Sequence, residues 1–160
     1  MPEFTHVDGD RARMVDVSAK GELFRKAVAS GMIRMKKTTI SAIREGTVIK
    51  GNVLATARVA AVLAIKDTSR IIPMCHAIPV HGIDIDFTLE DESISATVSV
   101  ISSGKTGVEM EALVGVSTAL LTIWDMVKSA EKDEKGQYPV TEISQIRVVE
   151  KIKHGLSETN

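Results

Sequence analysis

Cysteine is nearly missing from this chain of 160 residues, and its scarcity bears on where the protein works. The single cysteine, Cys75, has no second thiol with which to form an intrachain disulfide. A chain with a single cysteine and no intrachain disulfide is typical of reducing compartments. The first residues, Met1–His6, lack the apolar core of a signal peptide, and the longest apolar run, Val59–Ile65, is too short to span a bilayer. We therefore expect a cytoplasmic protein.

Aromatic residues and net charge are scarce as well. Aromatic side chains make up 3% of the chain, so that the core must be built from Ile, Val, Leu, Ala and Met. Charged residues reach 26% but nearly cancel, which leaves a formal net charge of −1. A balanced chain offers no global attraction to nucleic acid or to an anionic membrane. Any anion site has to be a local cluster.

The pattern of apolar residues predicts one domain over residues 1–160, with residues 1–13 polar and flexible. Alternation predicts strands at Met14–Val17, Ala27–Met35 (although Gly31 counts against it), His81–Glu90, Ser93–Ile101 and around Ile143–Val149. Helices are predicted from Thr38 or Thr39 to Arg44 with a stop at Gly46, from Val53 to Lys66 with Asn52 as the N-cap, and from Val108 to Glu131 before a charged loop, Lys132–Gln137. Strands and helices mix without regular βαβ alternation. This favours an α+β protein with helices packed on one face of a mostly antiparallel sheet.

A glycine-rich turn lies where phosphate-binding loops usually lie. Residues 103–113 read Ser-Gly-Lys-Thr-Gly-Val-Glu-Met-Glu-Ala-Leu, between a strand pattern and a helical pattern. A Walker A motif needs a further glycine five positions before its Gly-Lys-Thr, and that position is Ser99. The Walker interpretation therefore fails on spacing. What remains is a short turn that delivers two carboxylates, Glu109 and Glu111, to the start of a helix.

The long helix is apolar on two sides. One stripe, which should cover the sheet, consists of Val108, Ala112, Val116, Ala119, Leu120, Ile123 and Val127. Met110, Val114 and Leu121 fall on the opposite side, so that a second cover is expected, either the other helix or another copy of the chain. Asp125 and Lys128 project from this second side. They are suited to proton transfer, or they form an ordinary surface ion pair at i, i+3.

The two ends of this helix are too far apart to serve one small molecule. Glu111 and Asp125 are fourteen positions apart, which is roughly 21 Å along a helix axis. If both ends take part in the same chemistry, a second subunit must bring its own end alongside. We therefore expect a site between subunits.

Two further segments are candidates for ligand binding. Lys50-Gly51-Asn52 precedes a helix, where free N–H groups favour a phosphate; the alternative is a plain helix start with a solvated lysine. The loop Pro73–Pro79 carries Cys75 and His76, and His76 is suited to binding a phosphate, to moving a proton or to a structural hydrogen bond. The spacing of Cys75, His76 and His81 is weak evidence for zinc, and no separate base identifies a cysteine nucleophile.

Five segments, in order over most of the chain, resemble the cyclic pyranopterin monophosphate synthase family of molybdenum cofactor biosynthesis. They are Met14–Ser18, Lys50–Arg58, Pro73–His76, Gly104–Leu113 and Asp125–Lys128. The block Gly-Lys-Thr-Gly-Val-Glu-Met-Glu-Ala-Leu is long and unusual, so that a chance match is improbable.

The resemblance implies a lyase that converts (8S)-3′,8-cyclo-7,8-dihydroguanosine 5′-triphosphate, made by a partner radical GTP cyclase, into cyclic pyranopterin monophosphate with release of diphosphate. It implies no metal and no redox cofactor for this step, and neither nucleic acid nor membrane as a partner. Family members are ferredoxin-like α+β proteins that assemble as a homohexamer, a trimer of dimers, with active sites between subunits. That assembly agrees with the two-sided helix.

The resemblance also assigns roles by position. It gives the acid–base pair as Asp125 and Lys128. It gives the substrate-binding residues as Met74, Cys75, His76, Glu109, Met110, Glu111, Lys50, Arg25 and Lys151.

The chain departs from the family after Lys151. The family commonly has a small, glycine-rich segment there, whereas this chain reads Ile152-Lys153-His154-Gly155. How the C-terminal segment closes over a substrate is therefore open. Two alternatives to an enzyme are a module that senses phosphorylated ligands through Gly104–Gly107, and a structural subunit whose Asp125–Lys128 pair only fixes an interface.

Overall fold

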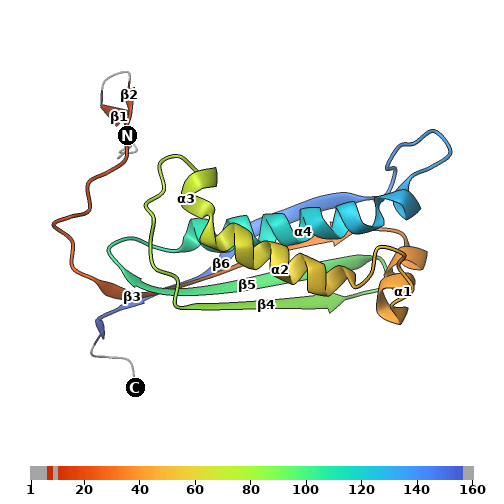
Figure 1. Cartoon of the computed structure of the whole chain (residues 1–160), viewed down its shortest axis with the longest axis horizontal. Helices are drawn as coiled ribbons and strands as arrows, with labels where there is room; N and C mark the ends of the chain where they lie inside the picture. Colours follow the sequence, from red (N-terminus) through yellow and green to blue (C-terminus); the bar gives the residue numbers. More distant parts are fainter. Residues whose placement is uncertain (1–6, 9–10, 157–160) are drawn as a thin grey trace.

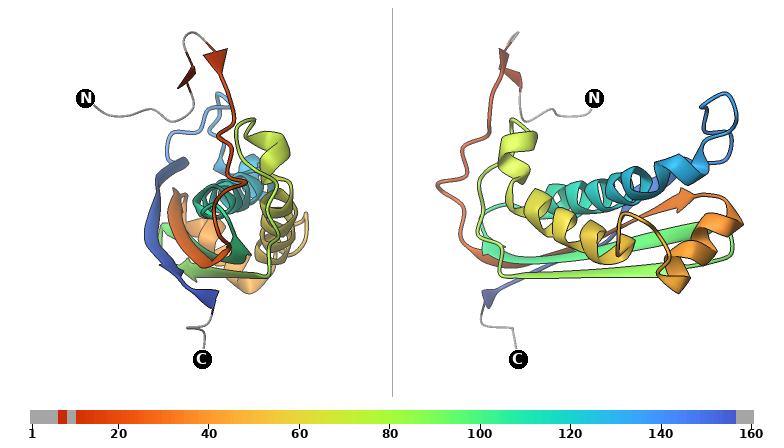
Figure 2. Two further views of the ribbon diagram at one scale, coloured as in Figure 1. Left: turned by 90° about the vertical axis from the view of Figure 1, so that its left-hand side faces the viewer. Right: turned by 45° about the vertical axis from the view of Figure 1, so that its right-hand side comes forward.

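The computed structural model describes residues 7–8 and 11–156 of the chain. The predicted flexibility of residues 1–13 falls largely on residues outside these ranges and stays a prediction. Within the described part, β1 (Val7–Asp8) pairs with β2 (Arg11–Ala12) in an antiparallel hairpin. This hairpin stands away from the rest of the fold (Figure 2).

The body of the protein is a four-stranded antiparallel sheet covered by helices on one face (Figures 1 and 2). Its elements, in chain order, are β3 (Leu23–Arg34), α1 (Lys37–Glu45), α2 (Val53–Lys66), α3 (Thr68–Ile71), β4 (Gly82–Leu89), β5 (Ser93–Gly104), α4 (Glu109–Glu131) and β6 (Glu142–His154). The spatial order of the strands is β4-β5-β3-β6, and each neighbouring pair is antiparallel. This is the split βαβ arrangement of ferredoxin-like folds, as the family resemblance implies.

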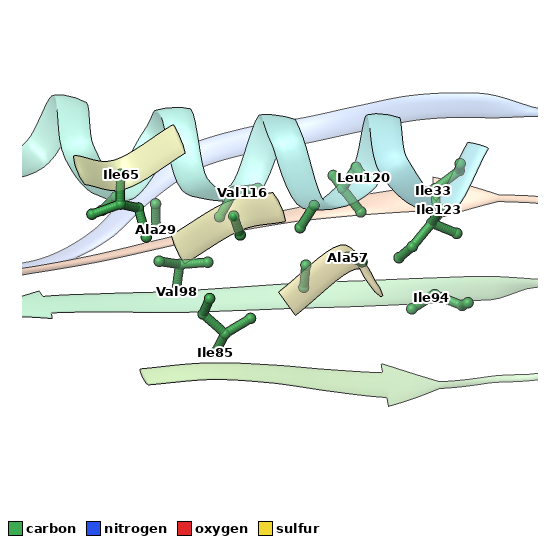
Figure 3. Packing of buried hydrophobic residues seen from close by; sticks show 14 of the residues in the cluster. Ala29, Ile33, Ala57, Ile65, Ile85, Ile94, Val98, Val116, Leu120 and Ile123 are labelled. Atoms are coloured by element: carbon green, nitrogen blue, oxygen red, sulfur yellow. The ribbon is translucent and has the colours of Figure 1, made fainter. Parts of the chain in front are cut away.

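The core lies between the sheet and the two helices α2 and α4 (Figure 3). The predicted stripe of α4 is confirmed, because each of its residues from Val108 to Val127 is almost fully buried. Gly31, which counted against a strand, lies in the middle of β3. A Cβ atom there would lie 2.8 Å from Cγ1 of Val116 and 2.9 Å from Cδ1 of Leu120. Glycine is therefore favoured at this position, since any side chain would require the side chains of Val116 and Leu120 to shift within the core.

Helix α4 is also apolar outside the stripe. By length and composition it is the one helix in residues 7–8 and 11–156 that could cross a membrane, and half of its apolar segment is buried inside the protein. α2 packs along one side of it. The side that neither the sheet nor α2 covers exposes 37% of Met110 and 60% of Leu121. The sequence predicts that either the other helix or another copy of the chain covers the second apolar side of α4. Helix α2 covers only a part of that side.

Several predicted elements are confirmed by the structure. Asn52 caps α2, with its side-chain oxygen 2.9 Å from the amide nitrogen of Ala55. Gly46 ends α1 in the left-handed conformation, at φ 70°. The hairpin of β4 and β5 forms around the predicted turn, and the charged loop after α4 is present.

Two predictions about local structure are wrong. Residues Met14–Val17 form no strand; they run as an extended segment beside the loop of His76. Four alternating residues cannot distinguish a strand from an extended segment, because only a neighbouring strand decides between them. Neither Thr38 nor Thr39 caps α1 either. The N-cap is Lys36, whose backbone N–H donates to the fully buried carboxylate of Glu131 at 3.2 Å.

Candidate active site

The C-terminal end of α4 gathers an acid and two lysines. Lys128 donates to Asp125, with 2.7 Å between Nζ and Oδ1, and Lys50 approaches the other carboxylate oxygen at 3.2 Å. Lys50 also donates to the backbone carbonyl of Asp125 at 2.8 Å. The hydrogen bond and charge of Lys128, followed by those of Lys50, hold the pKa of Asp125 below its ordinary value. Asp125 in turn raises the pKa of Lys128. The result is an ionised, solvent-accessible triad.

Lys50 reaches α4 because of the turn that precedes α2. The amide of Gly51 donates to the carbonyl of Val48 at 3.0 Å, and Gly51 has a φ of 99°, which favours glycine. A cavity of about 290 Å³ adjoins this turn and is lined by Thr38, Thr39, Ala42, Thr47, Val48, Ile49, Lys50, Met126, Val127, Ser129 and Ala130. The predicted phosphate-binding lysine thus lies beside the predicted acid–base pair, where the carboxylate of Asp125 holds it.

The N-terminal end of α4 gathers a second charged group. The carboxylate of Glu109 forms an ion pair with Lys151 of β6. Burial alone would raise the pKa of Glu109, but the hydrogen bond and charge of Lys151, together with the charge of Arg25, lower it. Arg25 is buried and donates at 3.4 Å to the carbonyls of Gly104 and Lys105. Arg25, which the resemblance assigns to the substrate, therefore also fixes the glycine-rich turn.

A cavity of about 440 Å³ opens beside this group. It is lined by Val15, Val17, Lys20, Met74, Cys75, His76, Thr106, Gly107, Glu109, Met110 and Glu111. Burial, and the neighbouring charge of Glu109, raise the pKa of Glu111. Burial and the charge of Glu111 raise the pKa of the Cys75 thiol. Glu111 therefore gives up its proton less readily than Glu109, and the cavity holds two carboxyl groups with opposite pKa shifts.

One wall of this cavity comes from the segment that was predicted to be a strand. His76 Nε2 lies 2.7 Å from the carbonyl oxygen of Val15, and Lys105 donates to the carbonyl of Ser18 at 2.8 Å. The pattern around Val15 and Val17 gave no sign of a cavity wall. The sequence identifies Lys105 only as part of the glycine-rich turn. Its contact with Ser18 could not be predicted from that.

The candidate residues therefore form two groups at opposite ends of α4. Lys50, Asp125 and Lys128 lie at one end, and all the others lie at the other: Arg25, Met74, Cys75, His76, Glu109, Met110, Glu111 and Lys151. The separation of about 21 Å that the helix rise gives between Glu111 and Asp125 holds, because α4 is one continuous helix. A single chain does not bring the two groups together.

Two other polar residues near the candidate site residues in sequence, His81 and Arg58, have local partners. His81 Nε2 lies 2.8 Å from Oγ of Ser103. Arg58 donates to the carbonyl of Ile85 at 3.2 Å and lies over the ring of Phe87, so that it packs against β4. No three His, Cys, Asp or Glu side chains stand close enough to hold a metal ion within residues 7–8 and 11–156.

Comparison with known proteins places these groups in a family. The sequence pattern of the MoaC family matches residues 14–154, which is most of the chain. The chain belongs to the MoaC family.

Relatives of this MoaC family member match along nearly their whole length. A protein of Methanospirillum hungatei is 78% identical over 156 residues, which are 98% of this chain and 100% of the relative. A protein of Methanoregula boonei is 68% identical, and one of Pyrococcus furiosus is 58% identical; these cover 96% and 94% of this chain and 99% and 97% of the relatives. All three are named probable cyclic pyranopterin monophosphate synthase.

Proposed function

We propose that this protein is a cyclic pyranopterin monophosphate synthase, a lyase of molybdenum cofactor biosynthesis. It converts (8S)-3′,8-cyclo-7,8-dihydroguanosine 5′-triphosphate into cyclic pyranopterin monophosphate and diphosphate by acid–base catalysis. The protein works in the cytoplasm, a radical GTP cyclase supplies its substrate, and no cofactor takes part. The observation that carries the proposal is the division of the site residues between the two ends of α4, within a MoaC family chain.

The chemistry suits the residues at each end. Opening and reclosing of the rings require protons to move at several atoms, and Asp125 with Lys128 forms an acid–base pair in hydrogen-bond contact. Release of diphosphate builds negative charge on the leaving group, which a cation such as Lys50 stabilises. At the other end, carboxylates such as Glu109 and Glu111 are suited to accept hydrogen bonds from the N–H groups of a guanine-derived ring. Arg25 and Lys151 add positive charge there.

The active site is formed by two copies of the chain. The uncovered side of α4 carries Met110 near its start, Leu121 past its middle, and Asp125 with Lys128 near its end. If two copies pack these sides together about a two-fold axis perpendicular to α4, their α4 helices run antiparallel. Asp125 of one copy then approaches Glu111 of the other, and the exposed apolar side chains become buried. Two equal sites result, and three such dimers form the hexamer.

Subunit mixing tests this arrangement. Asp125→Asn and Glu111→Gln should each assemble but lose most of their turnover. Refolded together, they should recover about a quarter of wild-type activity, because each mixed dimer contains one site free of substitutions. A mixture of Asp125→Asn with Lys128→Ala is the matched control and should recover none, since both changes lie at the same end of α4. Absence of recovery in the first mixture would contradict the shared site, and unchanged turnover of Asp125→Asn would contradict its catalytic role.

A further inference from the structure

Lys151 lies near the end of a strand that has one neighbour in the sheet. β6 is an edge strand, and its one sheet partner among the described residues is β3. The last registered pairs are Ala27 with Lys151, Lys26 with Ile152, Arg25 with Lys153 and Phe24 with His154. The ends of edge strands open more readily than the middle of a sheet, since few contacts oppose fraying. A group at the end of β6 therefore decides how firmly Lys151 is held.

His154 supplies such a contact. Its imidazole ring stacks on the ring of Phe24, with 4.3 Å between the ring centroids and 12° between the ring planes. The stack joins the last registered residue of β6 to the second residue of β3. Stacked rings at this separation attract each other beyond the area that they bury. The stack closes the open end of the β3–β6 pair.

The stack and the ion pair lie on opposite faces of the sheet. Neighbouring side chains of a strand point to opposite faces, so that His154 and Ile152 share one face and Lys153 and Lys151 share the other. Lys151 forms its ion pair with Glu109 of α4, which is on the helix-covered face. His154 therefore acts on Lys151 through the backbone of β6 alone.

We propose that His154 is a positioning residue for Lys151. By stacking on Phe24 it keeps the end of β6 paired with β3, and this holds the ammonium group of Lys151 at Glu109 beside the cavity. Part of this inference rests on the proposed function, since it assumes that Lys151 binds the substrate. The structural part, that the stack holds the strand end, does not depend on it.

Three single variants test both parts. His154→Ala removes the stack, His154→Tyr keeps an aromatic ring there, and Lys153→Ala is a matched control that removes a neighbouring side chain outside the stack. Amide hydrogen exchange over residues 150–154 should be faster in His154→Ala and close to wild type in the other two. The KM for the cyclic nucleotide should rise roughly two- to tenfold in His154→Ala, the range expected from losing an aromatic pair, while kcat changes less. His154→Tyr should restore the KM.

The outcomes separate this inference from the proposed function. Unchanged amide exchange in His154→Ala would show that the stack does not hold the end of β6, whatever the kinetics show. Exchange that is equally fast in Lys153→Ala would show the same. In a Lys151→Ala background, His154→Ala should have no further effect on the KM; an undiminished effect overturns the positioning role. If Lys151→Ala alone leaves the KM unchanged, Lys151 does not bind the substrate. Faster exchange in His154→Ala, restored by His154→Tyr, would still show that the stack holds the end of β6.

Discussion

The carboxylate of Glu109 folds back over Gly107 and occupies the space that a side chain at residue 107 would need. A Cβ atom at Gly107 would lie 2.7 Å from the carboxyl carbon of Glu109, well inside the usual contact distance between carbon atoms. The glycine before α4 is thus explained by the ion pair between Glu109 and Lys151. This relationship leads to the first prediction.

Gly107→Ala should displace the Glu109 carboxylate and break its ion pair with Lys151. We expect the KM for the cyclic nucleotide to rise by about tenfold or more while the fold is retained. Steady-state kinetics with a thermal melt measures both. Gly104→Ala is the matched control from the same turn, because a Cβ atom there meets its nearest neighbour, Oγ of Ser102, at an ordinary 3.5 Å. Equal kinetics of the two variants would show that the position of Glu109 is unimportant.

Lys50→Ala should weaken binding of the triphosphate substrate, most clearly at low salt. The lysine lies at the acid–base pair, and the attraction between exposed charges falls as ionic strength rises. We expect about a tenfold loss of affinity at low salt and a smaller loss at high salt, measured by calorimetry with the Asp125→Asn variant to prevent turnover. Lys135→Ala, in the exposed charged loop after α4, is the control. An affinity equal to that of the parent variant would remove Lys50 from the site.

Glu111→Gln should stabilise the protein near neutral pH while it lowers activity. The folded-state pKa of Glu111 is raised by burial and by the charge of Glu109. As the pH rises from the ordinary value of 4.5, the unfolded chain loses this proton before the folded chain does, so that ionisation of Glu111 lowers the free energy of unfolding. Removing the carboxyl group removes that penalty.

Urea unfolding at several pH values measures this effect. The gain in unfolding free energy of Glu111→Gln should be present above the folded-state pKa and vanish below pH 4.5, where both states hold the proton. Glu134→Gln, in the exposed loop after α4, should show no such dependence. A gain that persists at low pH would mean that the cause is not ionisation of Glu111.

Leu121→Arg should separate the two copies of the chain. Leu121 is 60% exposed on the side of α4 that we assign to the dimer, and a buried, unpaired guanidinium group there is costly. We expect smaller species in analytical ultracentrifugation, loss of turnover and an unchanged fold. Thr97→Arg places the same charge on the helix-free face of the sheet and should leave the pairing intact. Dissociation of Thr97→Arg with intact pairing of Leu121→Arg would show that the interface lies on the sheet.

Most of the fold could be predicted because it depends on local patterns. The period of the apolar residues marks β3, β4, β5 and α4, and the cap at Asn52 needs only its own helix. The failures lie where a distant partner decides. Lys36 is the N-cap of α1, and its amide donates to Glu131, which is 95 positions away. The alternation of Met14–Val17 resembles a strand, but the segment is a cavity wall: His76 contacts the carbonyl of Val15, and Lys105 donates to that of the adjacent Ser18.

The candidate site divides in the same way. The place of Glu111 and Asp125 on one helix, and their spacing of roughly 21 Å along it, could be read from the amino-acid sequence. The contacts of Lys50 with Asp125 and of Lys151 with Glu109 arise only when the chain folds. Spacing along a helix is fixed by hydrogen bonds between near neighbours, whereas these ion pairs depend on how a loop and an edge strand pack against α4.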